Sequence, residues 1–302
     1  MVFPSHKDIR SLNLKNPTYK SLVDFYLFGE MERDTPNGDI TTELILQGKS
    51  KAISANISSK EAGIIAGKYE LDYFLKALKI NINWHVDDGE PVERDTKILE
   101  LHGDATTILK AERPLLNFLG RLSGIATITS SCVKKVPKNV LVCPTRKTLW
   151  GLLDKKAVSL GGGGTHRLNL SSAFLAKENH LSLIKNRNIT ELKNIFPQRD
   201  EEAFGRFCEI EVENEKEALE AVMVLSSLKK TQGVIMFDNF SAQSIKKVLP
   251  RVREICPKVL FEASGGITLE NIGEFGESGV DILSLGILTH SAKNLDLSLR
   301  VE

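Results

Sequence analysis

The chain has few cysteines, and they follow no recognisable pattern. Its 302 residues include only four, which are Cys132, Cys143, Cys208 and Cys256. No two of them have the CxxC spacing of a metal or redox motif, and the gaps suggest no disulfide framework. Cys143 and Cys208 lie in apolar runs. We therefore expect buried thiols in a protein of the reducing cytoplasm.

Long apolar runs are also missing. The first 20 residues are polar, are broken by Pro4 and Pro17, and hold no apolar signal core. No stretch approaches the roughly 18 consecutive apolar residues that a transmembrane helix requires. The sequence therefore predicts a cytoplasmic protein that has no membrane partner.

Neither sign of charge is in excess. With 40 basic and 39 acidic residues, the formal net charge is only +1. General nucleic-acid binders usually carry a basic excess, so we expect no nucleic-acid partner. Hydrophobic residues make up 41% and charged residues 26% of the chain, as in ordinary globular proteins. The length fits one large α/β domain, or a barrel with a smaller domain.

Several catalytic motifs are absent. The six histidines show neither HExxH nor another paired metal spacing, which argues against a catalytic zinc site. The chain also lacks the GxSxG nucleophile elbow, and it lacks GxxxxGK followed by Ser or Thr. Zinc hydrolases, serine hydrolases and P-loop nucleotide hydrolases are therefore poor matches.

What the chain does contain is a change of rhythm near residue 138. Before it, helical spacing at 19–28 and 69–78 mixes with strand patterns at 52–58 and 80–86, followed by a long amphipathic segment at 106–133. After it, helical stretches alternate with six short apolar strands, at 140–143, 173–176, 207–212, 234–237, 259–261 and 281–285. Such alternation favours a parallel sheet or a barrel. Since a full barrel has eight strands, six indicate an incomplete one.

Polar residues follow five of these six strands, and lie in and after the third. They are Thr145–Thr148, Lys177–His180, Glu209 with Glu211 and Glu213, Asp238–Asn239, Ser264–Gly266 and Gly286. In a βα barrel the carboxyl ends of the strands meet on one face, where active sites are built. The sequence therefore predicts one site at that face.

The cations of this site call for an anionic ligand. Arg146, Lys147, Arg167 and Lys177 would repel one another without one, and His166 lies beside them in the sequence. Two glycine-rich stretches, 161–164 and 264–266, permit backbone N–H groups to approach an oxyanion. A glycine run by itself is equally compatible with a flexible turn, but its position before Thr165-His166-Arg167 favours an anion-binding loop.

Acidic residues complement these cations. Glu211 and Asp238 suit Mg²⁺ held with a pyrophosphate, ribose hydroxyls, or a developing positive charge. A period of two places Glu209 and Glu213 on the strand face of Glu211. Ion pairing of Glu209 and Glu213 with the lysines is an equally good interpretation.

At these motifs the chain resembles quinolinate phosphoribosyltransferases, also called carboxylating nicotinate-nucleotide pyrophosphorylases. The shared blocks include Thr145-Arg146-Lys147-Thr148, the glycine run that ends in His166-Arg167, and Lys177-Glu178-Asn179-His180. The resemblance runs in order from about residue 38 to the C-terminus. Further blocks are 38–42, 112–113, 116–119, 122–127, 209–213, 238–239, 262–267, 279–286 and 289–291.

The resemblance implies an N-terminal α/β sandwich domain and an open, incomplete (β/α) barrel. We expect the sandwich to span residues 1–125, with the tail from about 288 to 302 packing back on it, and the barrel to span 126–287. The implied reaction joins quinolinate to phosphoribosyl pyrophosphate and yields nicotinate mononucleotide, pyrophosphate and CO₂, in de novo NAD biosynthesis. The implied assembly is a homodimer, or a hexamer of dimers, with shared active sites.

The resemblance also assigns roles to residues. Quinolinate would be bound by Arg146, His166, Arg167 and Lys177, and by Arg113 from the neighbouring subunit. Phosphoribosyl pyrophosphate and its Mg²⁺ would be surrounded by Lys147, Lys177, Glu211, Asp238, Ser264, Gly265 and Gly286. Of these, Lys147, Glu211 and Asp238 are the predicted catalytic residues, and Glu211 and Asp238 the predicted magnesium ligands.

Several positions depart from the family pattern. Pro144 stands where an Asp is often found, and Thr165 where Asn or Ser is usual. Leu149-Trp150-Gly151 stands where Thr-Pro-Gly is common, and Leu168-Asn169-Leu170-Ser171 replaces the common Gly-Leu-Tyr-Asp. Two alternatives therefore stay open. One is a related phosphoribosyltransferase for another aromatic acid, which includes the molybdenum-transport-associated homologues. The other is a barrel that binds an anionic metabolite without turnover.

Overall fold

The computed structural model describes residues 4–184, 187–196 and 201–302. The chain forms two compact units, each assembled from separate segments. The first, here called the barrel unit, comprises the described residues of 1–8, 131–147 and 163–287. The second, the sandwich unit, comprises residues 9–130, 148–162 and 288–302. The predicted domain boundaries, at 125 and 287, stay a prediction.

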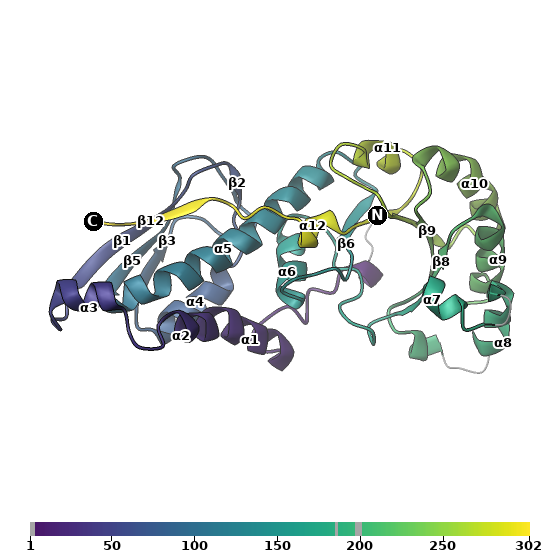
Figure 1. The fold of residues 1–302 in the computed structure, drawn as a ribbon. Coiled ribbons are helices and arrows are strands. Elements are labelled where there is room, and N and C mark those ends of the chain that lie inside the picture. Colours follow the sequence, from purple (N-terminus) through teal and green to yellow (C-terminus); the bar gives the residue numbers. More distant parts are fainter. Residues whose placement is uncertain (1–3, 185–186, 197–200) are drawn as a thin grey trace. The chain divides into compact units, whose positions relative to one another are not determined.

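A six-stranded parallel sheet forms the core of the barrel unit (Figure 1). Its strand order is β6-β11-β10-β9-β8-β7, so β6 and β7 are the open edges. The bounds are β6 (Leu141–Pro144), β7 (Phe174–Ala176), β8 (Phe207–Val212), β9 (Gln232–Asp238), β10 (Leu260–Ser264) and β11 (Ile282–Leu285). All six predicted strands are present, and the prediction of an open, incomplete barrel is confirmed.

Helices follow these strands, and polar caps mark where two of them begin. Asn214 accepts a hydrogen bond from the Glu217 amide at 3.0 Å, which starts α9 (Glu215–Leu225). Ser241 caps α10 (Ala242–Ile255) in the same way, through the amide of Ser244. The α9 helix packs on β8 and β9. Shorter helices are α7 (Glu178–Leu181), α8 (Leu192–Ile195) and α11 (Ile272–Gly276), with 3₁₀ turns at Pro4–His6, Ile189–Glu191 and Glu201–Phe204.

An antiparallel sheet forms the core of the sandwich unit. Its order is β12-β1-β5-β3, and Figure 1 shows β12 beside β1. The bounds are β1 (Ala52–Ser59), β3 (Asn81–Trp84), β5 (Lys97–Asp104) and β12 (Leu297–Val301), with a second pair of β2 (Gly63–Ile64) and β4 (Pro91–Val92). The sequence analysis did not predict β5 and β12. Both pair with β1, from which they are far apart in the sequence.

The sandwich unit has one long helix and several shorter ones. The long helix is α5 (Ala105–Val133), whose last three residues belong to the barrel unit. It passes through Pro114 without interruption. The others are α1 (Pro17–Asp24) with a π-helical turn at Phe25–Gly29, α2 (Glu30–Asp34), α3 (Ile40–Leu46), α4 (Lys68–Ala77), α6 (Leu152–Leu160) and α12 (Ile287–His290), which begins at the last residue of the barrel unit. No helix in the described part of the chain is long and apolar enough to cross a membrane.

A buried ion pair joins α5 to α6. The Arg121 guanidinium lies 3.0 Å from the Asp154 carboxylate, and both side chains are almost completely buried. The same carboxylate accepts hydrogen bonds from the backbone amides of Leu149 and Trp150. Asp154 therefore has a structural role at the start of α6.

Candidate active site

The predicted site residues of the barrel unit lie at one edge of the parallel sheet. Asp238 and Ser264 are the last residues of β9 and β10, and the pairing of these strands sets them opposite each other. The others lie close to the carboxyl ends of their strands, namely Arg146 and Lys147 after β6, Lys177 after β7, Glu211 near the end of β8, and Gly265 and Gly286 after β10 and β11. The fold therefore gathers residues from all six strands on the face where barrel enzymes build their sites.

Lys177 and Glu211 form an ion pair across β7 and β8. The Lys177 ammonium donates to one oxygen of the Glu211 carboxylate, and the Glu178 amide donates to the other at 3.2 Å. Glu211 is buried, whereas the side chain of Lys177 remains partly exposed. The pair holds one negative and one positive group of the predicted site in fixed positions.

Asp238 lies next to this ion pair on β9. Its pKa is raised by partial burial and then by the negative charge of Glu211. The Asn239 side chain donates to its carboxylate at 2.7 Å. Two neighbouring carboxylates that disfavour each other's charge fit an added cation. A Mg²⁺ ion held by these two carboxylates would also need water and substrate oxygens as ligands.

The loop after β10 requires glycine. Gly265 has a φ of +90°, and a Cβ at this position would lie 2.2 Å from the side-chain oxygen of Asn239. At Gly266, φ is +63° and a Cβ would meet no atom within 4 Å. The loop beside Asp238 therefore leaves its backbone open to a ligand.

Two arginines approach each other in the barrel unit. Arg167 is only 5% exposed, and its pKa is lowered by burial and by the positive charge of Arg146. Its guanidinium donates to the Ala173 carbonyl at 3.5 Å, and it forms no ion pair with any described residue. Two guanidinium groups in this position are stabilised by an anion, and their planar forks match a carboxylate.

His166 is buried between two carboxylates. Its Nε2 lies 3.1 Å from Glu262 and 3.4 Å from Glu209, the first close enough for a hydrogen bond and the second for an ion pair. Burial opposes a charged imidazole, but Glu262 and Glu209 outweigh burial and raise its pKa to about 9. The two carboxylates therefore favour a proton on Nε2 of His166, while Nδ1 of the same ring accepts a hydrogen bond from the Arg167 amide at 2.8 Å.

The carboxylates on either side of His166 have different protonation preferences. Burial and the neighbouring Glu262 raise the pKa of Glu209 to about 7. Burial also opposes ionisation of Glu262, but His166 holds the pKa of Glu262 below its usual value. Neither Glu209 oxygen forms a hydrogen bond with a described residue. Glu209 therefore keeps a proton more readily than Glu262.

The sequence analysis missed two members of this cluster, His6 and Glu262. Together with His166 they place three buried ligand atoms within 4.8 Å of one another, a grouping that could hold a metal ion. Both ring nitrogens of His166 already have partners, Nε2 with Glu262 and Nδ1 with the Arg167 amide, so these hydrogen bonds account for the position of the ring. Glu262 had a sequence signal, since it is the only acid in the apolar run of β10. No signal in the sequence connects His6 with the site.

The remaining predictions concern Glu209, Glu213 and Arg113. Glu213 pairs with Arg187 at 2.8 Å and Glu209 with His166, so neither forms an ion pair with a lysine within the described ranges. Arg113 lies in the sandwich unit on α5, where it is exposed and pairs with Glu112 at 3.0 Å. Its role in a neighbouring subunit stays a prediction.

The glycine run before His166 packs closely against its surroundings. A Cβ at Gly161 would lie 2.4 Å from the Ala126 carbonyl oxygen, and one at Gly164 would lie 2.6 Å from Cys143 Sγ. The amides of Gly161, Gly162 and Gly164 all donate to backbone carbonyls. The run therefore provides close packing, and these three amides are not available to an oxyanion.

Fold and site together define an α/β-barrel enzyme for anionic substrates, with paired cations and acids at the carboxyl ends of its strands. More specifically, the chain belongs to the quinolinate phosphoribosyl transferase family. The family's N-terminal domain matches residues 39–123 and its C-terminal domain matches residues 125–300.

Relatives from several kingdoms share this assignment. A probable nicotinate-nucleotide pyrophosphorylase (carboxylating) from Methanocaldococcus jannaschii is 40% identical, over 90% of this chain and 94% of its own length. The Bacillus subtilis protein of the same name is 36% identical, over 93% of this chain and 92% of its own. Among solved structures, the nicotinate-nucleotide pyrophosphorylase of Francisella tularensis is 32% identical with a TM-score of 0.79, covering 93% of this chain and 96% of its own.

Proposed function

We propose that this chain transfers the phosphoribosyl group of phosphoribosyl pyrophosphate to quinolinate, which yields nicotinate mononucleotide, pyrophosphate and CO₂. Membership of the family supports the reaction. The structural observation that supports this reaction is that the barrel site has a cationic side and an acidic side. A buried Arg167 lies near Arg146 and forms no ion pair with a carboxylate in the part of the chain that the structure describes, and the Lys177–Glu211 pair lies beside Asp238.

The cationic side of the site binds the pyridine dicarboxylate. Arg146 and Arg167 supply planar forks for its carboxylates. His166 lies beside them and fixes the backbone of Arg167, because its Nδ1 accepts from the Arg167 amide at 2.8 Å. Lys177 lies next to the acids, where it contacts both substrates. These groups hold the pyridine nitrogen next to the anomeric carbon. The rate increase comes from this orientation and from charge.

The acidic side of the site acts on the ribose. As pyrophosphate leaves, the anomeric carbon becomes positively charged, and Glu211 or Asp238 stabilises that charge. Lys147 and the backbone of Ser264, Gly265 and Gly286 surround the phosphates. Once the nitrogen carries the ribose, its positive charge stabilises the electron pair left at C2 when the 2-carboxylate departs as CO₂, and C2 then takes up a proton from water. No side chain needs to act as a general base.

Glu211 and Asp238 are the residues that would hold Mg²⁺. The raised pKa of Asp238 beside Glu211 supports this, because a cation removes the unfavourable interaction of two carboxylates. When bound, the ion neutralises the charge that develops on pyrophosphate. Lys147 and Lys177 add to that neutralisation.

We further propose a cytoplasmic homodimer. Support for the cytoplasm comes from the four cysteines, which are all free and of which three are buried. Support for the dimer comes from Arg113, an exposed arginine on α5 that has only its sequence neighbour Glu112 as a partner among the described residues.

The decisive experiment measures pyrophosphate release from phosphoribosyl pyrophosphate with quinolinate and nicotinate side by side. We expect release with quinolinate, together with an equal amount of CO₂, and little release with nicotinate. Release with nicotinate or another aromatic acid alone would assign the chain to a different phosphoribosyltransferase. Binding of quinolinate without any release would make it a binding protein.

A further inference from the structure

A short N-terminal segment, Pro4–Asp8, belongs to the barrel unit although the next residues of the chain belong to the sandwich unit. It precedes residue 39, where the match to the family begins. Its central residue, His6, is completely buried.

The backbone of this segment is bonded to the loop that carries His166 and Arg167. The His6 carbonyl accepts from the Thr165 amide at 2.8 Å and from the His166 amide at 3.2 Å. The Thr165 hydroxyl accepts from the Asp8 amide at 2.9 Å and lies 3.1 Å from the His6 carbonyl oxygen. Thr165 is one of the departures from the family pattern, and its hydroxyl bonds this N-terminal segment.

The loop needs such support because His166 is strained. Its φ is +50°, in the left-handed region that favours glycine. Residues in this region persist only when their surroundings hold them there. Gly164 permits the contact, since a Cβ at that position would lie 2.9 Å from the His6 carbonyl oxygen.

The His6 ring supports the His166 ring directly. It stacks on Phe207 with 4.1 Å between ring centroids, and it meets the edge of His166 at 5.2 Å. Phe207 is the first residue of β8, the strand that carries Glu209 and Glu211. The segment therefore contacts the loop with His166 and Arg167, which binds quinolinate in the proposed function, and also the neighbouring strand β8.

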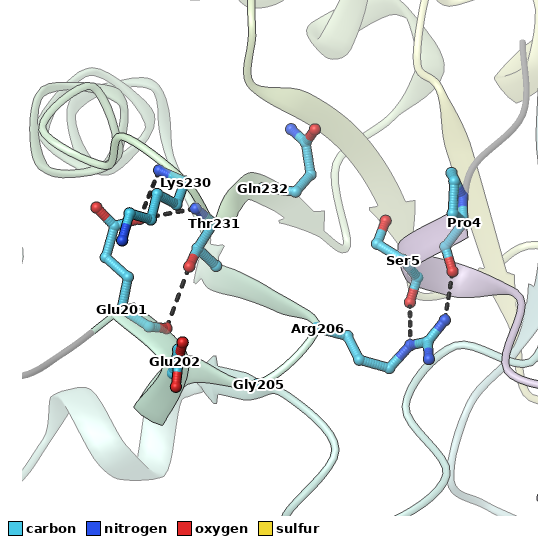
Figure 2. A pocket seen from close by; sticks show the side chains of 9 residues that line it. All are labelled: Pro4, Ser5, Glu201, Glu202, Gly205, Arg206, Lys230, Thr231 and Gln232. Atoms are coloured by element: carbon cyan, nitrogen blue, oxygen red, sulfur yellow. Dashed lines mark hydrogen bonds between the residues drawn. The ribbon is translucent and has the colours of Figure 1, made fainter.

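Arg206, the residue before β8, holds the segment in place. Its guanidinium donates to the carbonyls of Pro4 and Ser5 (Figure 2). It also lies 3.4 Å from the Asp8 carboxylate. Its own amide donates to the Ser172 carbonyl at 2.9 Å. One side chain thus fixes both ends of the five-residue segment.

We propose that Pro4–Asp8 is a positioning segment for the quinolinate-binding loop, and that Thr165 and Arg206 are its positioning residues. This inference rests on the proposed function. The segment holds His166 in its left-handed conformation and so sets the direction of the neighbouring Arg167. Neither Thr165 nor Arg206 needs to touch a substrate.

Thr165→Val tests the proposal with little change of shape. It removes the hydroxyl that accepts from Asp8 and keeps the branched side chain. We expect the KM for quinolinate to rise about tenfold, the upper range for losing a buried hydrogen bond. The KM for phosphoribosyl pyrophosphate and kcat should stay nearly unchanged. Arg206→Ala should act in the same direction, and Arg206→Lys should restore part of the loss.

Hydrogen exchange supplies a readout that uses no substrate. In Arg206→Ala, the Thr165 and His166 amides should exchange faster than in the wild type, because their acceptor is no longer held. Arg251→Ala is the matched control, an exposed arginine of the same unit that pairs with Glu215. It should change neither the exchange nor either KM.

The outcomes separate the two proposals. A wild-type protein without quinolinate-dependent release would contradict the proposed function, while the exchange of the two amides would still decide the role of the segment. Unchanged exchange in Arg206→Ala overturns the positioning proposal, as does an equal rise of both KM values in Thr165→Val. If Arg206→Ala fails to fold, Thr165→Val and Arg206→Lys carry the test.

Discussion

Arg167 combines burial with the absence of a described ion-pair partner, and this combination makes it the most sensitive residue for acid binding. We expect Arg167→Ala to fold normally and to lose quinolinate binding, since each charge-assisted hydrogen bond contributes about 1.5–3 kcal/mol. Titration calorimetry with quinolinate measures the loss. The exposed Arg251→Ala serves as the control. Near-normal affinity in folded Arg167→Ala would remove this residue from the acid site.

His166 gives the site a pH dependence. Its pKa is about 9 in the folded chain, above its ordinary value. A raised pKa means that the folded state binds the proton more tightly, so the stabilisation is complete below about 6.5, the unfolded value, and is lost as pH rises through about 9. Glu262 and Glu209 favour the proton on the ring, while buried, neutral His6 adds no charge. Quinolinate affinity should fall over the same range, because His166 loses its proton there. The arginines stay charged and add no pH dependence of their own.

The measurement is the KM for quinolinate from neutral pH to about 10, compared between the wild type and His166→Gln. We expect a rise in the wild type and a flat profile at a weaker level in the variant. A wild-type KM that stays constant across this range would show that the imidazolium charge does not contribute to binding.

At the scale of elements, strand ends divide the site into two sides. Asp238 ends β9 opposite Ser264 of β10, next to the Lys177–Glu211 pair, whereas His166 and Arg167 lie on the loop before β7. We expect Asp238→Asn to lower kcat much more than it weakens quinolinate binding, because Asp238 acts on the ribose side. Steady-state kinetics with calorimetry separate the two effects. A variant that loses quinolinate affinity but keeps its kcat would mean that the sides are wrongly assigned.

The junction of α5 and α6 depends on one buried charge pair. Asp154→Asn leaves the Arg121 guanidinium buried without its carboxylate, and breaking such a pair costs about 3–5 kcal/mol. Urea unfolding should show this loss in the free energy of unfolding. The exposed pair of Arg33 with Glu30 is the control, and Arg33→Gln should cost at most about 1 kcal/mol. An Asp154→Asn variant as stable as the wild type would contradict the structural role of the pair.

For the whole molecule, the open question is whether two chains share each site. Arg113→Ala and Lys147→Ala homodimers should each be inactive if Arg113 completes a neighbour's site. Mixing them under subunit exchange places both defects in one site of each heterodimer and leaves the other intact. About a quarter of all sites should then recover after random mixing. Failure to complement, with exchange shown independently, would place Arg113 outside the partner's site.

Local sequence patterns determined much of this protein. Short apolar runs predicted all six strands of the parallel sheet, because buried parallel strands are apolar on both faces. Polar residues in or after each run predicted the site, since parallel strands end at one edge. The ordered motifs predicted the family, which the comparisons confirm.

Contacts between distant segments were decided only by the tertiary structure. The pairing of β1 with β12 joins residues more than two hundred positions apart. Nothing in the sequence of either segment identifies the other as its partner. The same holds for His6 beneath His166, for Glu262 as the carboxylate that charges it, and for Arg206 over Pro4 and Ser5. A sequence pattern reports burial and periodicity along one segment. The partner that satisfies a buried charge or carbonyl is set by how the segments pack, and this is why the support of the acid-binding loop became visible only in the folded chain.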